Sequence, residues 1–553
     1  MKLTKLISLI LSLIMLITLV ACAAKSGEEG FIGDQDVGKL YPNQSEKAPS
    51  SVTNSSTAGN NVSNPDVDYN FSADMEWEEG VMEEPAEAPD AVMPQPPEGD
   101  VGDINVGIAE NPFIKTQDNN TSSFSADVDT ASYAYFRKLV NSGYSLSDLK
   151  YSGTSFRTEE FINYFKYDVK TPAPNELFGV YTSITPCPWN AESCLLRVTL
   201  QAEKAINENG NNLVFLIDVS GSMGSSDKLP LLKRAFSYLV DNLTEKDTIS
   251  IVTYSGREQV VLEGCSGNKK TEIMNAINSL SASGSTNGEA GLKKAYQIAE
   301  SFMIEGGNNR IIMASDGDLN VGISSVEELK SFISDKRDQG VYLSVLGFGS
   351  GNYRDSMMET IADNGNGVYY YIDGESEAEK VFATDLLGTL YTVAEDVKLQ
   401  LEFNSELIDS YRLIGYENRV MSNEDFDNDK KDAGEVGASH QVTVCYEIKL
   451  AAYENDKSSV SPFVTLRVRY KNPGEPMSHL NEYYVINLES SASEDEKFLT
   501  AVIELCMLLH DSEYIGSTTL ADIAKDLSEL DLSAYPEREE LYNLVKQLIA
   551  RQK

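Results

Sequence analysis

Residues 211–391 alternate short apolar runs with segments of helical periodicity, and this alternation constrains the fold more than any other feature of the chain. The first run, NLVFLID, has the continuous apolar character of a strand that is buried on both faces. Further strands are predicted at residues 247–255, 310–315, 341–349 and 368–372. Amphipathic helices are predicted between and after them, at residues 228–243, 269–280, 288–303, 325–338, 353–363 and 376–391. Strands that alternate with helices predict a Rossmann-like α/β fold, with a doubly wound, mostly parallel sheet.

Three loops of this predicted sheet carry small side chains with oxygen atoms. Asp218 ends the first strand, Asp316 follows a later strand, and Thr286 lies in a Gly-rich loop that precedes a helix. Ser220 and Ser222 follow Asp218 at alternate positions. Ligand sites of open α/β sheets lie at the carboxyl ends of the strands. We therefore expect these five side chains to meet at one edge of the sheet.

The stretch DVSGSMGSSDKL does not fit the common phosphate-binding or nucleophile motifs. A phosphate-binding loop needs a lysine followed by serine or threonine after its glycines, and this stretch has none. The aspartyl nucleophile of the haloacid dehalogenase family would want a second aspartate where Ser220 stands. A serine hydrolase needs a histidine, and His440, His479 and His510 all lie outside the α/β segment. We therefore expect no enzymatic activity.

A hard cation fits this set of side chains. Mg²⁺ prefers oxygen ligands in near-octahedral geometry and keeps several waters. The D-x-S-x-S pattern, with Thr286 and Asp316, resembles the metal-ion-dependent adhesion site of von Willebrand factor type A (VWA) domains. The resemblance implies that the hydroxyls of Ser220, Ser222 and Thr286 bind Mg²⁺ or Mn²⁺, while Asp218 and Asp316 act directly or through waters. Neutral hydroxyl ligands leave the ion short of negative charge, so it would bind an Asp or Glu of a protein partner.

The segments on either side of the α/β domain carry period-two strand patterns, which indicate one β-sandwich completed by both flanks. Residues near the C-terminus have apolar positions three and four apart and are predicted to be helical. The predicted fold is therefore a VWA domain inserted in a flanking β-sandwich, with a helical C-terminal segment. We expect an N-terminal VWA-associated domain, the VWA domain, the sandwich region and the helical region at residues 120–205, 211–392, 393–490 and 491–553.

Motifs outside the metal-binding pattern extend the resemblance to a larger part of the chain. DVDTASYAYFRKLV, EEFINYF, LLRVTLQ and YRLIGYENR together resemble a family of bacterial VWA lipoproteins. Members of that family have their own N-terminal domain and an uncharacterised C-terminal domain. The match covers roughly residues 120–550 and implies no particular partner.

The N-terminus has the features of a secretion signal. Two lysines precede an apolar run from Leu6 to Ala21, which is shorter than the roughly 20 residues that span a membrane. The ending LVAC resembles a bacterial lipobox, which implies cleavage of residues 1–21 and a lipid anchor on Cys22. An uncleaved anchor and an ordinary signal peptide are the alternatives. Residues 22–119 are rich in Ser, Asn, Pro and acid and are predicted to form a disordered tether.

Two local features of the sequence allow more than one interpretation. Cys187 and Cys194 flank a predicted hairpin turn, so a disulfide between them is one prediction for an exported protein. Residues 425–436 have acids at positions 1, 3 and 5 of an EF-hand, but Lys430 stands where glycine is needed and Val436 where glutamate is needed. An acidic surface turn and a calcium loop of another kind are the two interpretations.

These observations predict a lipid-anchored binding module on the cell membrane, facing outside the cytoplasm, that uses a divalent metal to bind an acidic group on a protein partner in adhesion or envelope assembly. Asp318 and Leu319, just after Asp316, would stand on the rim of the site. The formal net charge of -41 excludes nucleic acid as a partner, because phosphates would be repelled. The alternatives are a structural lipoprotein with a vestigial metal site and a metal-dependent hydrolase.

Overall fold

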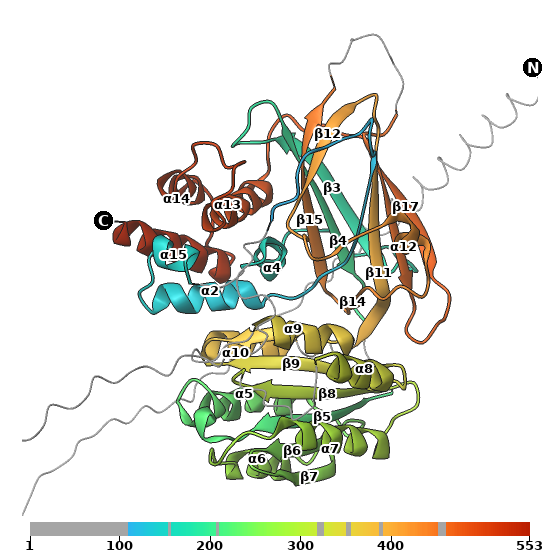
Figure 1. The fold of residues 1–553 in the computed structure, drawn as a ribbon, viewed down its shortest axis with the longest axis vertical. Coiled ribbons are helices and arrows are strands. Elements are labelled where there is room, and N and C mark those ends of the chain that lie inside the picture. The colour runs from blue at the N-terminus through green and yellow to red at the C-terminus, as the bar shows by residue number, and fades with distance from the viewer. Residues whose placement is uncertain are drawn as a thin grey trace, which may run out of the picture. The chain divides into compact units, whose positions relative to one another are not determined.

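The computed structural model describes residues 109–152, 156–205, 209–317, 326–349, 355–385, 391–451 and 461–552. All of them belong to one compact unit, Pro96–Lys553. No helix within these ranges is long and apolar enough to cross a membrane. The predicted signal peptide, Cys22 and most of the predicted tether lie outside the described residues. The described chain forms an α/β domain, a β-sandwich and a group of helices (Figure 1).

The α/β domain is built on a six-stranded sheet of order β10-β9-β8-β5-β6-β7. Its strands are β5 (Asn211–Asp218), β6 (Thr248–Tyr254), β7 (Glu258–Ser266), β8 (Asn308–Ser315), β9 (Tyr342–Phe348) and β10 (Tyr369–Ile372). Neighbouring strands are parallel except for β6 and β7, which confirms the predicted sheet. The edge strand β7 was not predicted, because only Cys265 in it is fully buried and its sequence lacks a continuous apolar run.

Helices cover both faces of this sheet, as predicted. Residues of β5 alternate between the two hydrophobic cores: Phe215 and Ile217 face one, and Val214 and Leu216 face the other. Helices α5 (Leu229–Asn242), α6 (Lys270–Ser279) and α10 (Glu375–Lys380) contribute to the first core. Helices α7 (Gly288–Ser301), α8 (Val326–Arg337) and α9 (Asp355–Asn364) contribute to the second. Of the helix predicted at 376–391, the structure describes the α-helical α10 and a π-helical turn (Val381–Asp385) that follows it, and residues 386–390 lie outside the described residues.

The β-sandwich contains two antiparallel sheets, of order β1-β12-β15-β4-β3 and β13-β2-β11-β16-β17, with β14 paired to β11. Strands before the α/β domain are β1 (Ile114–Lys115), β2 (Thr121–Ser125), β3 (Phe178–Pro186) and β4 (Cys194–Ala202). Strands after it are β11 (Thr392–Phe403), β12 (Ile408–Ile414), β13 (Val420–Met421), β14 (Gly434–Gly437), β15 (Gln441–Leu450), β16 (Val464–Lys471) and β17 (His479–Val485). β4 pairs with β15 and β2 pairs with β11, which confirms one sandwich built from both flanks.

Ordered structure begins before the predicted end of the tether at residue 119. Strand β1 pairs with β12, and the Thr116 hydroxyl donates a hydrogen bond to the Ile408 carbonyl at 2.7 Å. The Asn111 side chain donates to the Gly415 carbonyl at 2.9 Å. These contacts provide the fixed partners that a disordered segment lacks, so the tether prediction was too long at its C-terminal end.

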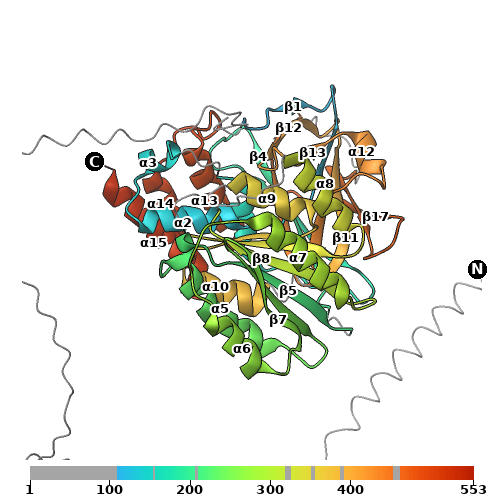
Figure 2. The same cartoon turned by 60° about the horizontal axis from the view of Figure 1, so that its bottom comes forward.

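The helical group combines helices that precede the α/β domain with helices from the C-terminal part of the chain. Its helices are α2 (Ala131–Asn141), α3 (Leu146–Lys150), α4 (Thr158–Tyr164), α13 (Glu494–Leu509), α14 (Leu520–Ser528) and α15 (Pro536–Arg551). Helices α2 and α4 share one hydrophobic core with α13, α14 and α15, and α2 lies beside α15 (Figure 2). Residues 120–205, predicted as one domain, thus contribute strands to the sandwich and helices to this group.

The hairpin between β3 and β4 is held without a disulfide. Cys187 and Cys194 are both free thiols, which decides the open question of a disulfide between them. The Glu447 carboxylate on β15 instead accepts hydrogen bonds from three side chains of the turn and pairs with Arg412 at 2.9 Å. The three donors are Trp189, Asn190 and Ser193. This buried carboxylate fixes the turn that a disulfide would otherwise have closed.

Candidate metal centre

The carboxyl ends of two neighbouring strands place the predicted carboxylates. Asp218 is the last residue of β5 and is fully buried, and Asp316 follows β8 directly and is 4% exposed. The two strands are parallel neighbours in register, with Ile217 opposite Ala314. The two aspartates therefore stand at adjacent strand ends, as the topology rule predicts.

The two predicted serine ligands lie in the turn that follows β5. The Ser220 backbone N–H donates a hydrogen bond to Asp218 Oδ1 at 2.8 Å. A 3₁₀ turn, Gly221–Gly224, then brings Ser222 Oγ to 3.0 Å from Ser220 Oγ. Asp218, Ser220 and Ser222 are thus linked by direct contacts, and two of the predicted hydroxyl ligands meet at the strand end.

The loop that carries Thr286 is hydrogen-bonded to this turn. The Ser283 N–H donates to the Val219 carbonyl at 2.7 Å, and the Gly221 N–H donates to the Gly284 carbonyl at 3.0 Å. Helix α7 starts just after the loop and packs close to β6, since a Cβ on Gly291 would lie 2.7 Å from the Tyr254 Cβ. Backbone contacts thus hold the loop of the half-buried Thr286 beside the turn with the two serines.

Lys228 is a member of the site that the sequence analysis missed. Its Nζ lies 2.8 Å from Asp316 Oδ2 and donates a hydrogen bond to the Ser222 carbonyl at 3.0 Å. The side chain is 13% exposed and packs against Gly349, where a Cβ would lie 2.1 Å from Lys228 Cε. A lysine next to the start of a helix normally reaches into solvent, so this contact could not be predicted from the residue pattern.

The chemistry of this edge suits a hard divalent cation. The five predicted residues offer carboxylates and hydroxyls, which are oxygen ligands of the kind that Mg²⁺ binds. The ammonium of Lys228 shows that Asp316 already attracts a cation. Burial and the charge of Asp218 raise the pKa of the neighbouring Tyr254 phenol, so this tyrosine stays neutral. The residues present therefore fit a metal; Asp318 and Leu319 lie outside the described residues.

Comparisons with known proteins identify the family of the chain. A family model of the von Willebrand factor type A domain matches residues 212–384, which include all five predicted ligands. Models described as von Willebrand factor and as the C-terminal part of the uncharacterised protein YfbK match residues 105–197 and 388–550. Protein YfbK of Escherichia coli (strain K12) is 41% identical over 437 residues, which cover 75% of each chain. The chain belongs to this family of bacterial VWA proteins.

Other proteins are similar to this chain at lower sequence identity. Human inter-alpha-trypsin inhibitor heavy chain H3 is 26% identical over 269 residues, which cover 44% of this chain and 29% of that protein. A solved structure, von Willebrand factor type A from Catenulispora acidiphila, is 17% identical, with a TM-score of 0.38 and coverage of 70% of this chain and 89% of that one. VWA domains commonly bind a divalent metal and typically mediate protein–protein interaction.

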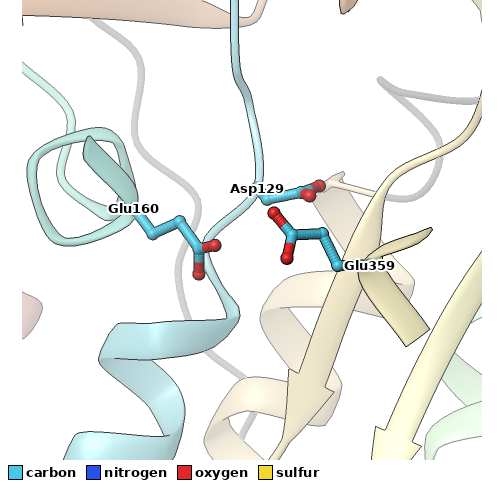
Figure 3. Close-up of side chains that lie close together, drawn as sticks. All are labelled: Asp129, Glu160 and Glu359. Carbon is cyan, nitrogen blue, oxygen red and sulfur yellow. The ribbon is translucent and has the colours of Figure 1, made fainter. Parts of the chain in front are cut away.

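A second group of acids is buried where the VWA domain meets the rest of the structure. Oxygen atoms of Asp129, Glu160 and Glu359 lie within 4.8 Å of one another, and Figure 3 shows the three carboxyl groups gathered together. Arg157 forms ion pairs with Glu160 and with Glu359, the second at 3.0 Å. Arg419 lies 3.9 Å from Asp129 and 3.5 Å from Glu359. Guanidinium groups thus neutralise part of this cluster, which we interpret as an ion-pair network that joins the domains.

The segment 425–436 does not form an EF-hand loop, because its first residues belong to helix α12 (Asn423–Asp427). Oxygen atoms of Asp396, Asp432 and Glu435 do lie within 4.8 Å of one another. However, Asp396 pairs with Lys471 at 2.6 Å and Asp432 pairs with Arg337 at 2.7 Å. These ion pairs favour the acidic surface turn over a calcium loop.

Replacing Glu159, next to the buried network, is expected to change the pH dependence of stability. The side chain is 1% exposed, and its Oε2 accepts a hydrogen bond from the Tyr416 N–H at 2.9 Å. Burial, followed by the charge of Glu417, raises the pKa of Glu159 from 4.5 to about 8. The stability contributed by the protonated group is therefore present below about pH 4.5 and is lost as the pH rises through 8.

The Glu159→Gln variant keeps the acceptor oxygen and cannot ionise. As the pH rises from 5 to 8, the unfolding free energy of the variant should increase relative to that of the wild type by about 1 to 2 kcal/mol. Urea unfolding at each pH measures this difference. Glu539→Gln, on the exposed side of α15, is the matched control and should give a constant difference. A constant difference for Glu159→Gln as well would show that Glu159 is ionised throughout this range.

Proposed function

We propose that this VWA protein is a lipid-anchored binding protein that uses Mg²⁺ or Mn²⁺ to bind an acidic group of a protein partner outside the cytoplasm. The observation that carries the proposal is the convergence of Asp218, Ser220, Ser222 and the Thr286 loop beside Asp316, whose carboxylate already binds an ammonium. The interaction role of VWA domains in general supports it. No catalytic role is proposed for this site.

The five side chains have different roles in the proposed site. Ser220, Ser222 and Thr286 would hold the metal through neutral hydroxyls, and Asp218 and Asp316 would hold it directly or through waters. The bound ion supplies a centre of positive charge that attracts a carboxylate. Because three of the ligands are neutral, an Asp or Glu of the partner would complete the charge balance. We propose adhesion or envelope assembly as the process that this contact would serve.

The anchor is the second part of the proposal. The lipobox-like LVAC sequence supports a lipid on Cys22, and the acidic segment after it supports a tether that extends the VWA domain from the membrane. Cell fractionation tests this part, because Cys22→Ser should move the protein from the membrane fraction to the soluble fraction. Retention of the variant in the membrane would favour an uncleaved anchor.

Metal binding should raise the stability of the wild type but not of Asp218→Ala. At a metal concentration of 100 times the dissociation constant, the gain is about 2.7 kcal/mol. Thermal unfolding in EDTA and in millimolar Mg²⁺ or Mn²⁺ measures it. The immobilised protein is then exposed to envelope proteins, and we expect capture of a partner that requires the metal.

Each arm of this experiment has a contradicting outcome. Capture that is equally strong in EDTA and with Asp218→Ala would contradict the metal-dependent binding function. An Asp218→Ala variant that folds, assembles and functions like the wild type would support a structural lipoprotein with a vestigial site. If metal raises the stability but capture of a partner does not depend on metal, the metal site is supported and its proposed role in partner binding is contradicted.

A further inference from the structure

A second candidate site lies far from the metal centre in the sequence, between the sandwich and the C-terminal helices. A cavity of about 310 Å³ is bounded by β3, β4, the start of α13 and the segment from the end of α14 to α15. Its volume lies at the small end of the range of about 300 to 1,000 Å³ that is typical of small-molecule sites. The lining residues that matter here are Arg197, Arg538, Asp168, Glu494, Asp495 and Asp531.

Arg197 carries a buried positive charge without a carboxylate beside it. The residue is 1% exposed, and its Nε donates a hydrogen bond to Thr199 Oγ1 at 2.9 Å. Its Nη2 has no hydrogen-bond partner among the described residues, and none of their carboxylates forms an ion pair with it. The guanidinium lies 4.6 Å from the Tyr167 ring centre and 4.7 Å from that of Tyr181. These rings position the cation, but they do not supply the acceptor that a buried guanidinium needs.

The other arginine of the cavity is already neutralised. Arg538 is 4% exposed, pairs with Asp495 at 2.7 Å and donates a hydrogen bond to the Lys166 carbonyl at 2.6 Å. The remaining acids of the lining, Asp168, Glu494 and Asp531, are exposed. The cavity therefore has positive charge on its buried side and negative charge at its mouth.

We propose that this cavity binds a small zwitterion of the α-amino acid class. The carboxylate of the ligand would face the Arg197 guanidinium from the cavity, because no carboxylate of the described residues neutralises that charge. The ammonium of the ligand would face the acids at the mouth. A simple anion fits less well, because exposed carboxylates at the entrance would repel it. The site is independent of the proposed metal centre and adds a small-molecule ligand to a protein proposed to bind a protein partner.

Calorimetric titration of the full-length protein with each of the twenty common α-amino acids tests this proposal. Acetate and methylamine, which carry one of the two charges each, are the comparison ligands. We expect at least one amino acid to bind at least tenfold more tightly than either comparison ligand. The proposal is overturned if no amino acid binds, or if acetate binds as tightly as the best amino acid.

Two variants assign the binding to this cavity. Arg197→Met keeps an apolar side chain between the tyrosine rings and should weaken binding of the best amino acid at least tenfold. Asp531→Asn changes an exposed residue, and asparagine keeps the oxygen that accepts the Ser533 N–H at 3.1 Å. Asp531→Asn should weaken binding of the amino acid but not of acetate. This variant alone still tests the proposal if Arg197→Met does not fold. Asp526→Asn on α14, outside the lining, is the matched control, and unchanged binding in both cavity variants would overturn the proposal.

Discussion

Replacing Arg419 with methionine is expected to lower the free energy of unfolding by about 3 to 5 kcal/mol, because the change removes one partner from a network of buried charges. Arg419 lies in the loop between β12 and β13 and reaches carboxylates of two other parts of the chain. Its Nη1 is 3.1 Å from Asp363 Oδ2, and its Nε is 3.4 Å from Asp127 Oδ2. Its Nη2 is 3.5 Å from Glu359 Oε1. Methionine would fill part of the volume but would leave these acids with less positive charge nearby.

The control for Arg419→Met is the same substitution at an exposed ion pair. Arg234 pairs with Glu375 at 2.8 Å, and both side chains are about half exposed, at 51% and 49%. Arg234→Met should therefore cost less than about 1 kcal/mol. Equilibrium unfolding in urea measures both variants. Equal losses for the two variants would mean that the buried network contributes no more than a surface pair.

A second substitution tests the electrostatic explanation. Burial, followed by the charge of Asp127, raises the pKa of Asp129 well above its ordinary value. Asp129→Asn keeps the oxygen that accepts the Tyr369 N–H at 2.9 Å and cannot ionise. Combined with Arg419→Met, it should recover part of the lost stability, because one fewer buried carboxylate then lacks a cation. No recovery would attribute the loss to packing instead.

The position of this network explains why it matters for the proposed binding function. Glu359 and Asp363 belong to α9 of the VWA domain, while Asp127 lies between β2 and α2. Arg157 and Glu160 stand at the start of α4. The network therefore connects the VWA domain to the sandwich and to the helical group at one place. Under the proposed function, these ion pairs would hold the VWA domain in a fixed position relative to the tethered part of the chain.

The sequence predicted those parts of the fold that depend on local pattern. The apolar runs at β5, β8 and β9 and the alternating pattern of β15 and β16 identified strands, because burial on one face or two leaves a periodic trace in the chain. The edge strand β7 left no such trace, since most of its residues are partly exposed. The pairing of Cys187 and Cys194 stayed open in the sequence because Glu447, which stabilises their hairpin, lies on a distant strand.

The same distinction applies to the candidate metal site, where some contacts could be predicted from the sequence and others depend on how the chain folds. Asp218, Ser220 and Ser222 are close in the sequence, so their proximity could be predicted. The topology rule for parallel sheets predicts that Asp316 lies at the same edge. Lys228 was missed because its contact with Asp316 depends on how the start of α5 folds back toward the end of β8. In the sequence, the motifs DVDTASYAYFRKLV, EEFINYF and YRLIGYENR indicate only a resemblance to the family. The structure shows that they supply Asp129, Glu160 and Arg419 to one buried network.

The last prediction concerns Lys228. Replacing it with methionine should strengthen metal binding about 10- to 100-fold, which corresponds to about 1.4 to 2.7 kcal/mol. The ammonium lies 2.8 Å from Asp316 Oδ2 and is mostly buried, so a divalent ion that uses Asp316 must displace this charge or bind beside it. Methionine keeps the apolar stem that packs against Gly349 and removes the competing charge.

The Lys228→Met variant should also be less stable than the wild type in EDTA, because Asp316 loses its ammonium partner. Thermal unfolding over a Mg²⁺ or Mn²⁺ titration measures both effects, and the metal-dependent gain should exceed that of the wild type. Lys233→Met in the first turns of α5 is the matched control, since the Lys233 ammonium contacts only the carbonyls of Asn278 and Leu280 among the described residues. If Lys228→Met loses stability in EDTA but binds metal with unchanged affinity, the lysine is a structural partner of Asp316 and does not compete with the ion. If both effects occur, the protein holds its metal site closed with its own cation until a divalent ion replaces it.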